Sequence, residues 1–289
     1  MRDFISSLST KYSFDRLYLE QIFTKVKLQQ KALSLIKPSK TDESQTITWD
    51  HYRKLFVNRD NIDKGKRFIS TYIVSLEKAH KNYGVPPAVI AAIIGIETKY
   101  GKNQGKFPVF DTLATLAFES SGRENFFREE LEAFILLCLD QGLHINKTKG
   151  SYAGALGIPQ FMPSSWRTFA IDFDQNGKTN LLTSPRDAIG SVANYLNKHG
   201  WDSNIPTHSV AIQEPGSNAK QFFTYELQAE YKYNDLQKGG FKDPLNKFPA
   251  YLDVSLVDLK LRNNKIIYWL ATKNFFAITK YNRSYKYAA

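Results

Sequence analysis

Residues 85–101, VPPAVIAAIIGIETKYG, constrain the fold most, because they predict a helix with well-defined ends. The helix can begin at Pro86 and Pro87, since a first helical turn does not need the N–H groups that proline lacks. It can end at Gly101, because glycine readily adopts the left-handed conformation that follows a last turn. An apolar helix of this length needs a hydrophobic core around it, so the sequence predicts a packed helical domain.

The same stretch places a carboxylate on its apolar face. The apolar positions recur at spacings of three and four, as expected for one face of a helix. They are Val89, Ile90, Ile93 and Ile94. Glu97 continues this spacing, and both burial and the negative end of the helix dipole favour a protonated carboxyl there. A general acid needs that form near neutral pH. The alternative is a structural glutamate paired with Lys99, Arg123 or Arg128.

Composition limits the classes of function. The chain has 289 residues, 42% of them hydrophobic, which is enough for a packed core and for two domains or three small subdomains. Its formal charge of +11 predicts acidic surroundings, such as nucleic acid, anionic lipid or a polyanionic cell wall. The basic residues are scattered and no nucleic-acid-binding motif is present, so we expect no nucleic-acid partner.

The cysteine count and the hydropathy pattern add two expectations. Cys138, the only cysteine, lies in the apolar run AFILLCL, so it is predicted to pack in a core. No stretch approaches the ~18 consecutive apolar residues of a membrane span, so we expect no transmembrane segment. The first ten residues lack the apolar centre of a signal peptide. The protein is therefore expected to be cytoplasmic, or exported with its signal removed.

Hydrophobic periodicity predicts further helices and one β region. The predicted helices cover residues 13–35, 60–83, 110–118, 123–141, 163–170 and 185–199. Between residues 205 and 281 the pattern becomes alternating and β-branched, with turn residues between segments, which predicts a small antiparallel β subdomain. Asp111, Glu119 and Glu130 are further carboxylates, but none lies on an apolar stripe as clearly as Glu97.

Two polar loops carry further candidate residues. Residues 150–165, GSYAGALGIPQFMPSS, are rich in small residues, so this backbone can approach a ligand closely. Ser151 and Gln160 are the polar positions there, and a purely structural loop is the alternative. Residues 172–187 begin with alternating oxygen donors before Gly177, as in the first half of a calcium loop. Thr183 replaces the usual closing glutamate and Asp187 is the nearest acid, so an Asp/Asn turn without metal is the alternative.

Several segments, in order and spacing, resemble the membrane-bound lytic murein transglycosylase B family. They are IIGIETKYG, DTLATLAF, SYAGALGIPQFMPSSW, the block from DFDQNGKTNLL to RDAIGSVANYL, and ITKYNRSYKYA. The resemblance implies a mainly α (α+β) fold: a lysozyme-like helical core, an N-terminal helical subdomain and a small inserted antiparallel β subdomain. The implied boundaries are 1–84 for the N-terminal subdomain, 85–204 with 270–289 for the core, and 205–269 for the β subdomain.

The resemblance also implies an activity and a set of site residues. Such enzymes cleave the MurNAc–GlcNAc β-1,4 bond of peptidoglycan without water and leave a 1,6-anhydro-muramyl end, and Glu97 matches their catalytic acid and base. The implied substrate-binding residues are Ser151, Gln160, Phe161, Met162, Arg123, Tyr281, Asn282 and Tyr287. The implied ligands of a structural calcium ion are Asp172, Asp174, Asn176, Lys178 and Asp187. The spacing before Asp187 is one residue longer than is usual in the family.

The implied partner is the peptidoglycan glycan strand, with other cell-wall enzymes as further candidates, in the periplasm or cell envelope. No cofactor is implied for the chemistry itself. The sequence carries no cysteine for N-terminal lipidation, so it does not by itself support a lipid anchor. Three alternatives remain open: a hydrolytic muramidase on the same scaffold, a non-catalytic peptidoglycan-binding protein, and a nucleic-acid binder. A muramidase would release products with reducing ends, and a non-catalytic protein would bind glycan without turnover. A nucleic-acid binder would retard a duplex in a gel.

Overall fold

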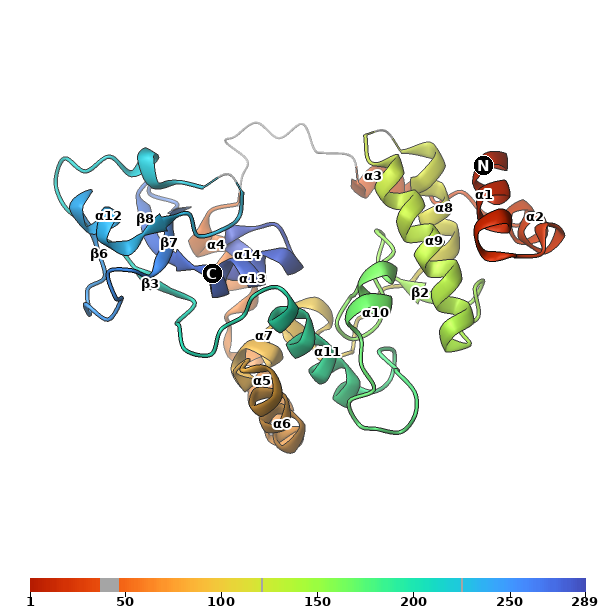
Figure 1. Cartoon of the computed structure of the whole chain (residues 1–289), viewed down its shortest axis with the longest axis horizontal. Helices are drawn as coiled ribbons and strands as arrows, with labels where there is room; N and C mark the ends of the chain where they lie inside the picture. Colours follow the sequence, from red (N-terminus) through yellow and green to blue (C-terminus); the bar gives the residue numbers. More distant parts are fainter. Residues whose placement is uncertain (37–46, 121, 225) are drawn as a thin grey trace. The chain divides into compact units, whose positions relative to one another are not determined.

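The computed structural model describes residues 1–36, 47–120, 122–224 and 226–289. The chain forms two compact units (Figure 1). The first contains Met1–Thr41 and Ala91–Val192, and the second contains Asp42–Ile90 and Ala193–Ala289. The three-part division predicted from the sequence has different boundaries and remains a prediction.

The elements follow one another in a mainly helical order. The helices are α1 (Arg2–Tyr12), α2 (Arg16–Thr24), α3 (Gln30–Ile36), α4 (Trp49–Phe56), α5 (Arg59–Thr71), α6 (Ile73–Tyr83), α7 (Pro87–Thr98), α8 (Val109–Glu119), α9 (Glu124–Gln141), α10 (Pro163–Phe169), α11 (Pro185–Lys198), α12 (Tyr233–Lys238), α13 (Lys273–Tyr281) and α14 (Tyr285–Ala288), with a 3₁₀ helix η2 (Ala219–Phe222). The strands are β1 (Phe107–Pro108), β2 (Lys149–Gly150), β3 (His208–Val210), β4 (Ile212–Gln213), β5 (Tyr231–Lys232), β6 (Phe241–Lys242), β7 (Asp253–Lys260) and β8 (Ile266–Thr272). The predicted mainly α fold with small antiparallel sheets is confirmed.

The first unit is built around α8 and α9, which lie side by side (Figure 1). Helix α8 is apolar on nearly every face and, apart from the half-buried Asp111, is buried from Val109 to Ala117, as expected for a central helix. The apolar second half of α9 packs in the same core, and the helix ends at Gly142 with a φ of 64°. Helix α10 packs on α9, and β1 pairs with β2, so residues 107–108 are fixed beside the start of the glycine-rich loop.

Helix α7 ends three residues before Gly101, earlier than predicted. Its last residue is Thr98, and the next three residues all have positive φ: 51° at Lys99, 63° at Tyr100 and 83° at Gly101. The Tyr100 ring folds back over Gly95, where a Cβ atom would lie 2.6 Å from the phenol oxygen. The left-handed turn thus begins at Lys99, because the chain folds back on its own last helical turn.

Two other predicted helices are interrupted. The predicted helix 13–35 forms as α2 and α3, and the side chain of Asp15 caps α2 by accepting the N–H of Leu17. The predicted helix 60–83 forms as α5 and α6, which separate at Tyr72, where ψ is 24°. Helix α5 begins at Arg59, one residue before the predicted start, and its N-cap is Asn58, whose side chain accepts the N–H of Asn61.

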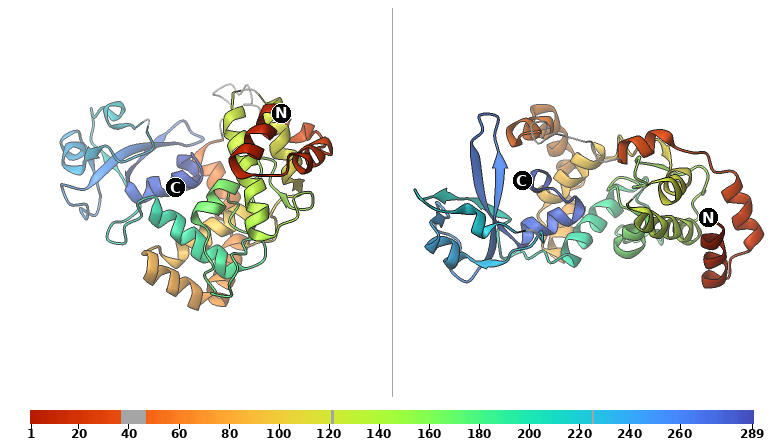
Figure 2. Two further views of the ribbon diagram at one scale, coloured as in Figure 1. Left: turned by 45° about the vertical axis from the view of Figure 1, so that its right-hand side comes forward. Right: turned by 90° about the horizontal axis from the view of Figure 1, so that it is seen from above.

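The second unit contains a four-stranded antiparallel sheet in the order β3-β8-β7-β5, with β4 paired to β6 in a separate two-stranded sheet. Strands β7 and β8 form a long hairpin (Figure 2). Alternate residues of β7 enter different clusters, because side chains alternate across a strand. Leu256 packs with Tyr233 and Phe241, whereas Val257 packs with Trp49. Both faces of the hairpin are therefore buried.

In the part of the chain that the structure describes, no helix is both long enough and apolar enough to cross a membrane.

Candidate active site

Glu97 lies in the last turn of α7, in the first unit. Its side chain is half-buried, whereas Ile93 and Ile94 on the same helix are 3% and 0% exposed. The apolar stripe therefore anchors the helix as predicted. The side chain of Glu97 lies at the edge of that buried face and is partly exposed.

The glycine-rich loop after β2 folds into a tight structure in the same unit. The N–H of Leu156 donates to the carbonyl oxygen of Phe161 at 2.8 Å, and the N–H of Phe161 donates to the carbonyl oxygen of Leu156 at 3.1 Å. Between them, Gly157 has a φ of 71°, and a Cβ atom there would lie 2.5 Å from the carbonyl oxygen of Leu181. Glycine is thus required where this loop meets residues 181–182.

Ser151 opens this loop and uses its hydroxyl oxygen as an acceptor. The Oγ atom accepts backbone N–H groups from Ala153 at 3.2 Å and from Ala155 at 3.0 Å. The proton of the hydroxyl has no acceptor in the described residues, and the side chain is half-buried. The Ser151 hydroxyl can therefore donate a hydrogen bond to an external carbonyl oxygen.

Gln160 and its neighbours close the loop. Gln160 has a φ of 52°, and its amide nitrogen donates to the carbonyl oxygens of Gly157 at 2.8 Å and Gln104 at 3.2 Å. Phe161 is 2% exposed and Met162 is half-buried. Of these three predicted residues, Phe161 contributes mainly packing, while Gln160 joins the loop to the turn after α7.

Arg123 is exposed at the start of α9. Its guanidinium carbon lies 4.7 Å from the ring centre of Phe126 and 5.3 Å from that of Phe127. Stacking on aromatic rings limits where an arginine side chain can extend. Arg123 therefore presents a positive charge held on an aromatic base.

The predicted C-terminal site residues lie in the second unit. The rings of Tyr281 and Tyr287 are stacked at 6.5 Å with an interplanar angle of 11°, and Tyr195 meets Tyr281 edge-on at 5.0 Å. The hydroxyl of Tyr195 donates to the carbonyl of Lys280, and burial raises the pKa of Tyr195 to about 12. Tyr287 is 6% exposed and Asn282 is exposed. Tyr281 and Tyr287 thus form an ordered aromatic pair at the end of α13.

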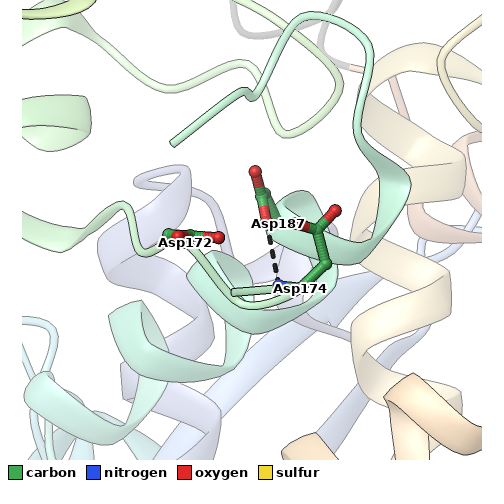
Figure 3. Close-up of side chains that lie close together, drawn as sticks. All are labelled: Asp172, Asp174 and Asp187. Carbon is green, nitrogen blue, oxygen red and sulfur yellow. Dashed lines mark hydrogen bonds between the residues drawn. The ribbon is translucent and has the colours of Figure 1, made fainter. Parts of the chain in front are cut away.

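Three predicted metal ligands gather at the start of α11 in the first unit (Figure 3). Asp172, Asp174 and Asp187 each offer a carboxylate oxygen, and these oxygens lie within 4.8 Å of one another. Asn176 and Lys178 form the turn of the loop, where the Asn176 side chain accepts the N–H of Lys178 at 3.0 Å. The loop therefore has the oxygen-rich composition that a calcium ion prefers.

The hydrogen bonds of the cluster indicate where an ion fits. Asp187 accepts backbone N–H groups from Phe173 and Asp174 through one oxygen and from Asn180 through the other. Burial raises the pKa of Asp187, and the nearby charge of Asp174 adds to this rise. The Oδ1 atom of Asp174 is buried and has no hydrogen-bond partner among the described residues. An unsatisfied buried carboxylate oxygen beside two other carboxylates fits a bound cation.

Glu130 has a role that the sequence did not indicate. It is 4% exposed, and its two oxygens accept the N–H and the hydroxyl of Ser164, at 2.9 and 2.6 Å. Ser164 is the second residue of α10, so this carboxylate caps the start of that helix. The early proline of α10 marked a helix start in the sequence. The partner on α9 could not be identified without tertiary contacts.

Comparisons with known proteins agree with this architecture. The whole chain, residues 1–289, matches the family described as the transglycosylase SLT domain. It is 36% identical to membrane-bound lytic murein transglycosylase B of Escherichia coli (strain K12), over 99% of this chain and 79% of that protein. The family predicted from the sequence motifs is thereby confirmed.

Solved structures give the same result. Soluble lytic transglycosylase SltB1 of Pseudomonas aeruginosa has a TM-score of 0.90 and 37% identity, with 99% of this chain and 93% of that chain covered. Escherichia coli lytic transglycosylase Slt35, in complex with calcium, has a TM-score of 0.86 and 36% identity, with 99% and 88% covered. SltB3 of Pseudomonas aeruginosa, in complex with NAG-anhNAM-pentapeptide, has a TM-score of 0.82 and 26% identity, with 99% and 75% covered. The predicted lysozyme-like helical fold is confirmed, and the chain belongs to the lytic murein transglycosylases of the transglycosylase SLT domain family.

Proposed function

We propose that this chain cleaves the MurNAc–GlcNAc β-1,4 bond of peptidoglycan without water, with Glu97 as the only catalytic carboxylate. Ordinary glycosidases use two carboxyl groups, either ~5 Å apart or ~6.5 to 9.5 Å apart around a water molecule. A single carboxyl group suffices when the substrate supplies its own nucleophile. The observation that carries the proposal is the position of Glu97, half-buried at the end of an otherwise apolar helix.

The proposed reaction has two proton transfers. Protonated Glu97 donates to the glycosidic oxygen as the bond from that oxygen to C1 of MurNAc breaks. The N-acetyl oxygen of MurNAc stabilises the positive charge that develops at C1. The Glu97 carboxylate then removes the proton of the C6 hydroxyl, whose oxygen attacks C1 and closes the 1,6-anhydro ring. Glu97 ends the cycle protonated, and no water is consumed.

Ser151 suits the role of orienting the N-acetyl group. Its oxygen is already fixed by two backbone N–H donors, so its own proton points to one remaining direction. A donor held in this way reduces the reorganisation needed when the substrate binds. We assign Ser151 to the N-acetyl carbonyl and Gln160 and Met162 to the walls of the sugar site, with Phe161, which is 2% exposed, packed behind them.

The remaining predicted residues are assigned to glycan binding outside the reacting bond. Arg123 offers a positive charge for acidic groups of the substrate, and the overall charge of +11 adds a salt-dependent attraction to a polyanionic wall. Tyr281 and Asn282 offer aromatic and polar surfaces of the kind that bind sugars, and the buried Tyr287 stacks on the Tyr281 ring. SltB3, with NAG-anhNAM-pentapeptide bound, supports a peptidoglycan fragment as the ligand. The corresponding location is the periplasm or cell envelope.

We also propose a structural calcium ion held by Asp172, Asp174 and Asp187. The support is the unsatisfied buried oxygen of Asp174 and the calcium complex of Slt35. A divalent cation there would reduce the repulsion among three neighbouring carboxylates and stabilise the loop. It has no part in the bond cleavage. Asn176 and the backbone of Lys178 are the further ligands that the loop sequence offers.

Glu97→Gln tests the catalytic assignment. The amide keeps the size of the side chain but cannot supply the proton, so release of anhydro-muramyl products should fall by about 10²- to 10⁴-fold. Sedimentation with purified sacculi should show unchanged glycan binding, which separates loss of chemistry from loss of folding. Turnover within threefold of the wild-type rate would refute the assignment.

A further inference from the structure

Thr98, which follows Glu97 directly, is the last residue of α7 and is fully buried. Its hydroxyl donates to the carbonyl oxygen of Ile158 at 2.7 Å and accepts the N–H of Gly101 at 2.9 Å. The carbonyl of Ile94, in the same helix, is also within reach at 3.3 Å. A hydroxyl has one proton, and the shorter bond is the one that leaves the helix. Thr98 therefore connects the last turn of α7 to the glycine-rich loop.

The acceptor of this bond is a fixed point of that loop. The N–H of Ile158 donates to the carbonyl of Leu181 at 2.8 Å, and Gly157 lies against the same carbonyl. Ile158 is 4% exposed and lies between Ser151 and Gln160 along the chain. The Ile158 carbonyl thus has little freedom, and a bond to it fixes the helix end against the loop that carries the proposed sugar ligands.

The side chain of Gln104 also fixes the turn after α7. The amide nitrogen of Gln104 donates to the carbonyls of Leu182 at 2.9 Å and Gly101 at 3.2 Å. The backbone carbonyl of Gln104 accepts the side-chain amide of Gln160 at 3.2 Å. The turn after α7 is therefore held on one side by Thr98 and on the other by Gln104.

The backbone at this place needs such support. Lys99 and Tyr100 both have positive φ, which side-chain-bearing residues rarely adopt and which persists only when the surroundings hold it. The hydroxyl of Thr98 accepts the N–H at the end of this turn. Without it, the strained turn can relax and carry the preceding residue, Glu97, away from its position.

We propose that Thr98 is a positioning residue, which aligns the Glu97 carboxyl with the sugar held by the loop of Ser151 and Gln160. Gln104 supports the same alignment from the other side of the turn. The inference rests on the proposed role of Glu97. Catalysis is sensitive to this placement, since a misplacement of ~1 Å can lower a rate by about 10²-fold.

Thr98→Val and Thr98→Ser separate the hydrogen bond from the packing. Valine keeps the shape and removes the hydroxyl, whereas serine keeps the hydroxyl and removes the methyl group. On soluble, uncross-linked peptidoglycan strands, we expect Thr98→Val to lower kcat by about 10- to 100-fold with KM within threefold. Thr98→Ser should stay within threefold of the wild type in kcat.

Thr112→Val is the matched control. Thr112 is also fully buried in the first unit, but its hydroxyl donates locally, to the carbonyl oxygen of Pro108 four residues earlier, at 2.7 Å. This variant loses a buried threonine hydroxyl whose bond joins neither the turn after α7 nor the glycine-rich loop, so its thermal stability should fall while kcat stays within threefold of the wild type. The pH profile of kcat should change in Thr98→Val and remain unchanged in Thr112→Val, which a purely structural loss would not produce.

The outcomes distinguish this inference from the proposed function. A kcat within threefold for Thr98→Val, or an equal loss in Thr98→Ser, overturns the positioning role. If Glu97→Gln is inactive in the same assay, its catalytic role survives that result. If Glu97→Gln stays active, both proposals fail. Should Thr98→Val not fold, Gln104→Leu removes the other half of the connection at a half-buried position, and an unchanged kcat there contradicts the inference.

Discussion

Glu97 at the C-terminal end of α7 and Glu130 in α9 lie in the same compact unit but in different surroundings. Glu130 is buried, both of its oxygens bond to Ser164, and burial raises the pKa of its carboxyl. Glu97 is half-buried in the last turn of its own helix, where the helix dipole opposes a negative charge. A raised pKa makes Glu130 a candidate acid, but both of its oxygens are committed to a helix cap. Glu97 is the more exposed of the two carboxyl groups, so accessibility to a ligand separates their roles.

The largest expected effect is on turnover. Glu97→Ala should lower the rate of glycan cleavage by about 10²- to 10⁴-fold, because it removes the proton donor. Glu130→Ala should leave the rate within threefold, measured at a temperature where both variants are folded by circular dichroism. Equal losses in both variants would mean that the two carboxyl groups act together, as in an ordinary glycosidase.

The second effect is on stability, where Glu130→Ala should have the larger effect and Glu97→Ala the smaller. Glu130→Ala leaves the N–H and the hydroxyl of Ser164 without their acceptor at the start of α10, so the free energy of unfolding should fall by about 3 kcal/mol. Glu97→Ala should change it by less than about 1 kcal/mol. Urea denaturation of both variants measures the difference. If Glu130→Ala lowered the free energy of unfolding less than Glu97→Ala does, the helix cap formed by Glu130 would not have the structural role assigned to it.

The third effect is on calcium-dependent stability. It concerns Asp174, which has a buried oxygen without a hydrogen bond among the described residues, whereas both oxygens of Glu130 are bonded. Because Asp174 has a buried oxygen without a hydrogen bond in the described chain, calcium should stabilise the protein by about 1.4 kcal/mol at tenfold its Kd. Calorimetry in calcium and in chelator measures this difference. Asp174→Asn should weaken the response, while Asp140→Asn, an exposed aspartate on α9, should not. An equal response in Asp174→Asn would place the ion elsewhere.

The smallest effect is on the pH dependence of stability. Burial raises the pKa of Glu130 above its ordinary value of 4.5, so the folded state binds this proton more tightly than the unfolded state does. Its contribution is therefore complete below pH 4.5 and is lost as the pH rises through the folded pKa. The stability of the wild type relative to Glu130→Gln should fall over that range in urea denaturation. If the stability of the wild type relative to Glu130→Gln rose with pH instead, the pKa of Glu130 would not be raised in the folded state.

Sequence periodicity identified the helices of the core because their apolar residues recur on one face, and α7, α8 and α9 follow from that pattern. It did not identify the breaks at Tyr72 and between α2 and α3, since no proline or glycine marks either position. It also placed the end of α7 at Gly101, because a left-handed turn through Lys99 and Tyr100 is a tertiary feature.

The candidate site shows the same limit. Glu97, Ser151 and the acidic loop are proposed from the sequence, because each breaks a local pattern: an acid on an apolar face, a polar residue among glycines, or alternating oxygen donors. Thr98 and Glu130 could not be predicted. The acceptor of Thr98 is 60 residues away and the donors to Glu130 are 34 residues away, so their roles depend on contacts that periodicity does not contain.

The product of cleavage in ¹⁸O-labelled water tests the central claim most directly. Purified sacculi are digested by the wild-type protein in labelled water, and the released muropeptides are weighed by mass spectrometry. Attack by the C6 hydroxyl of the substrate, with Glu97 as the only catalytic carboxylate, predicts anhydro-muramyl ends that contain no ¹⁸O. Reducing MurNAc ends that carry ¹⁸O at C1 would contradict it, because water would then be the nucleophile.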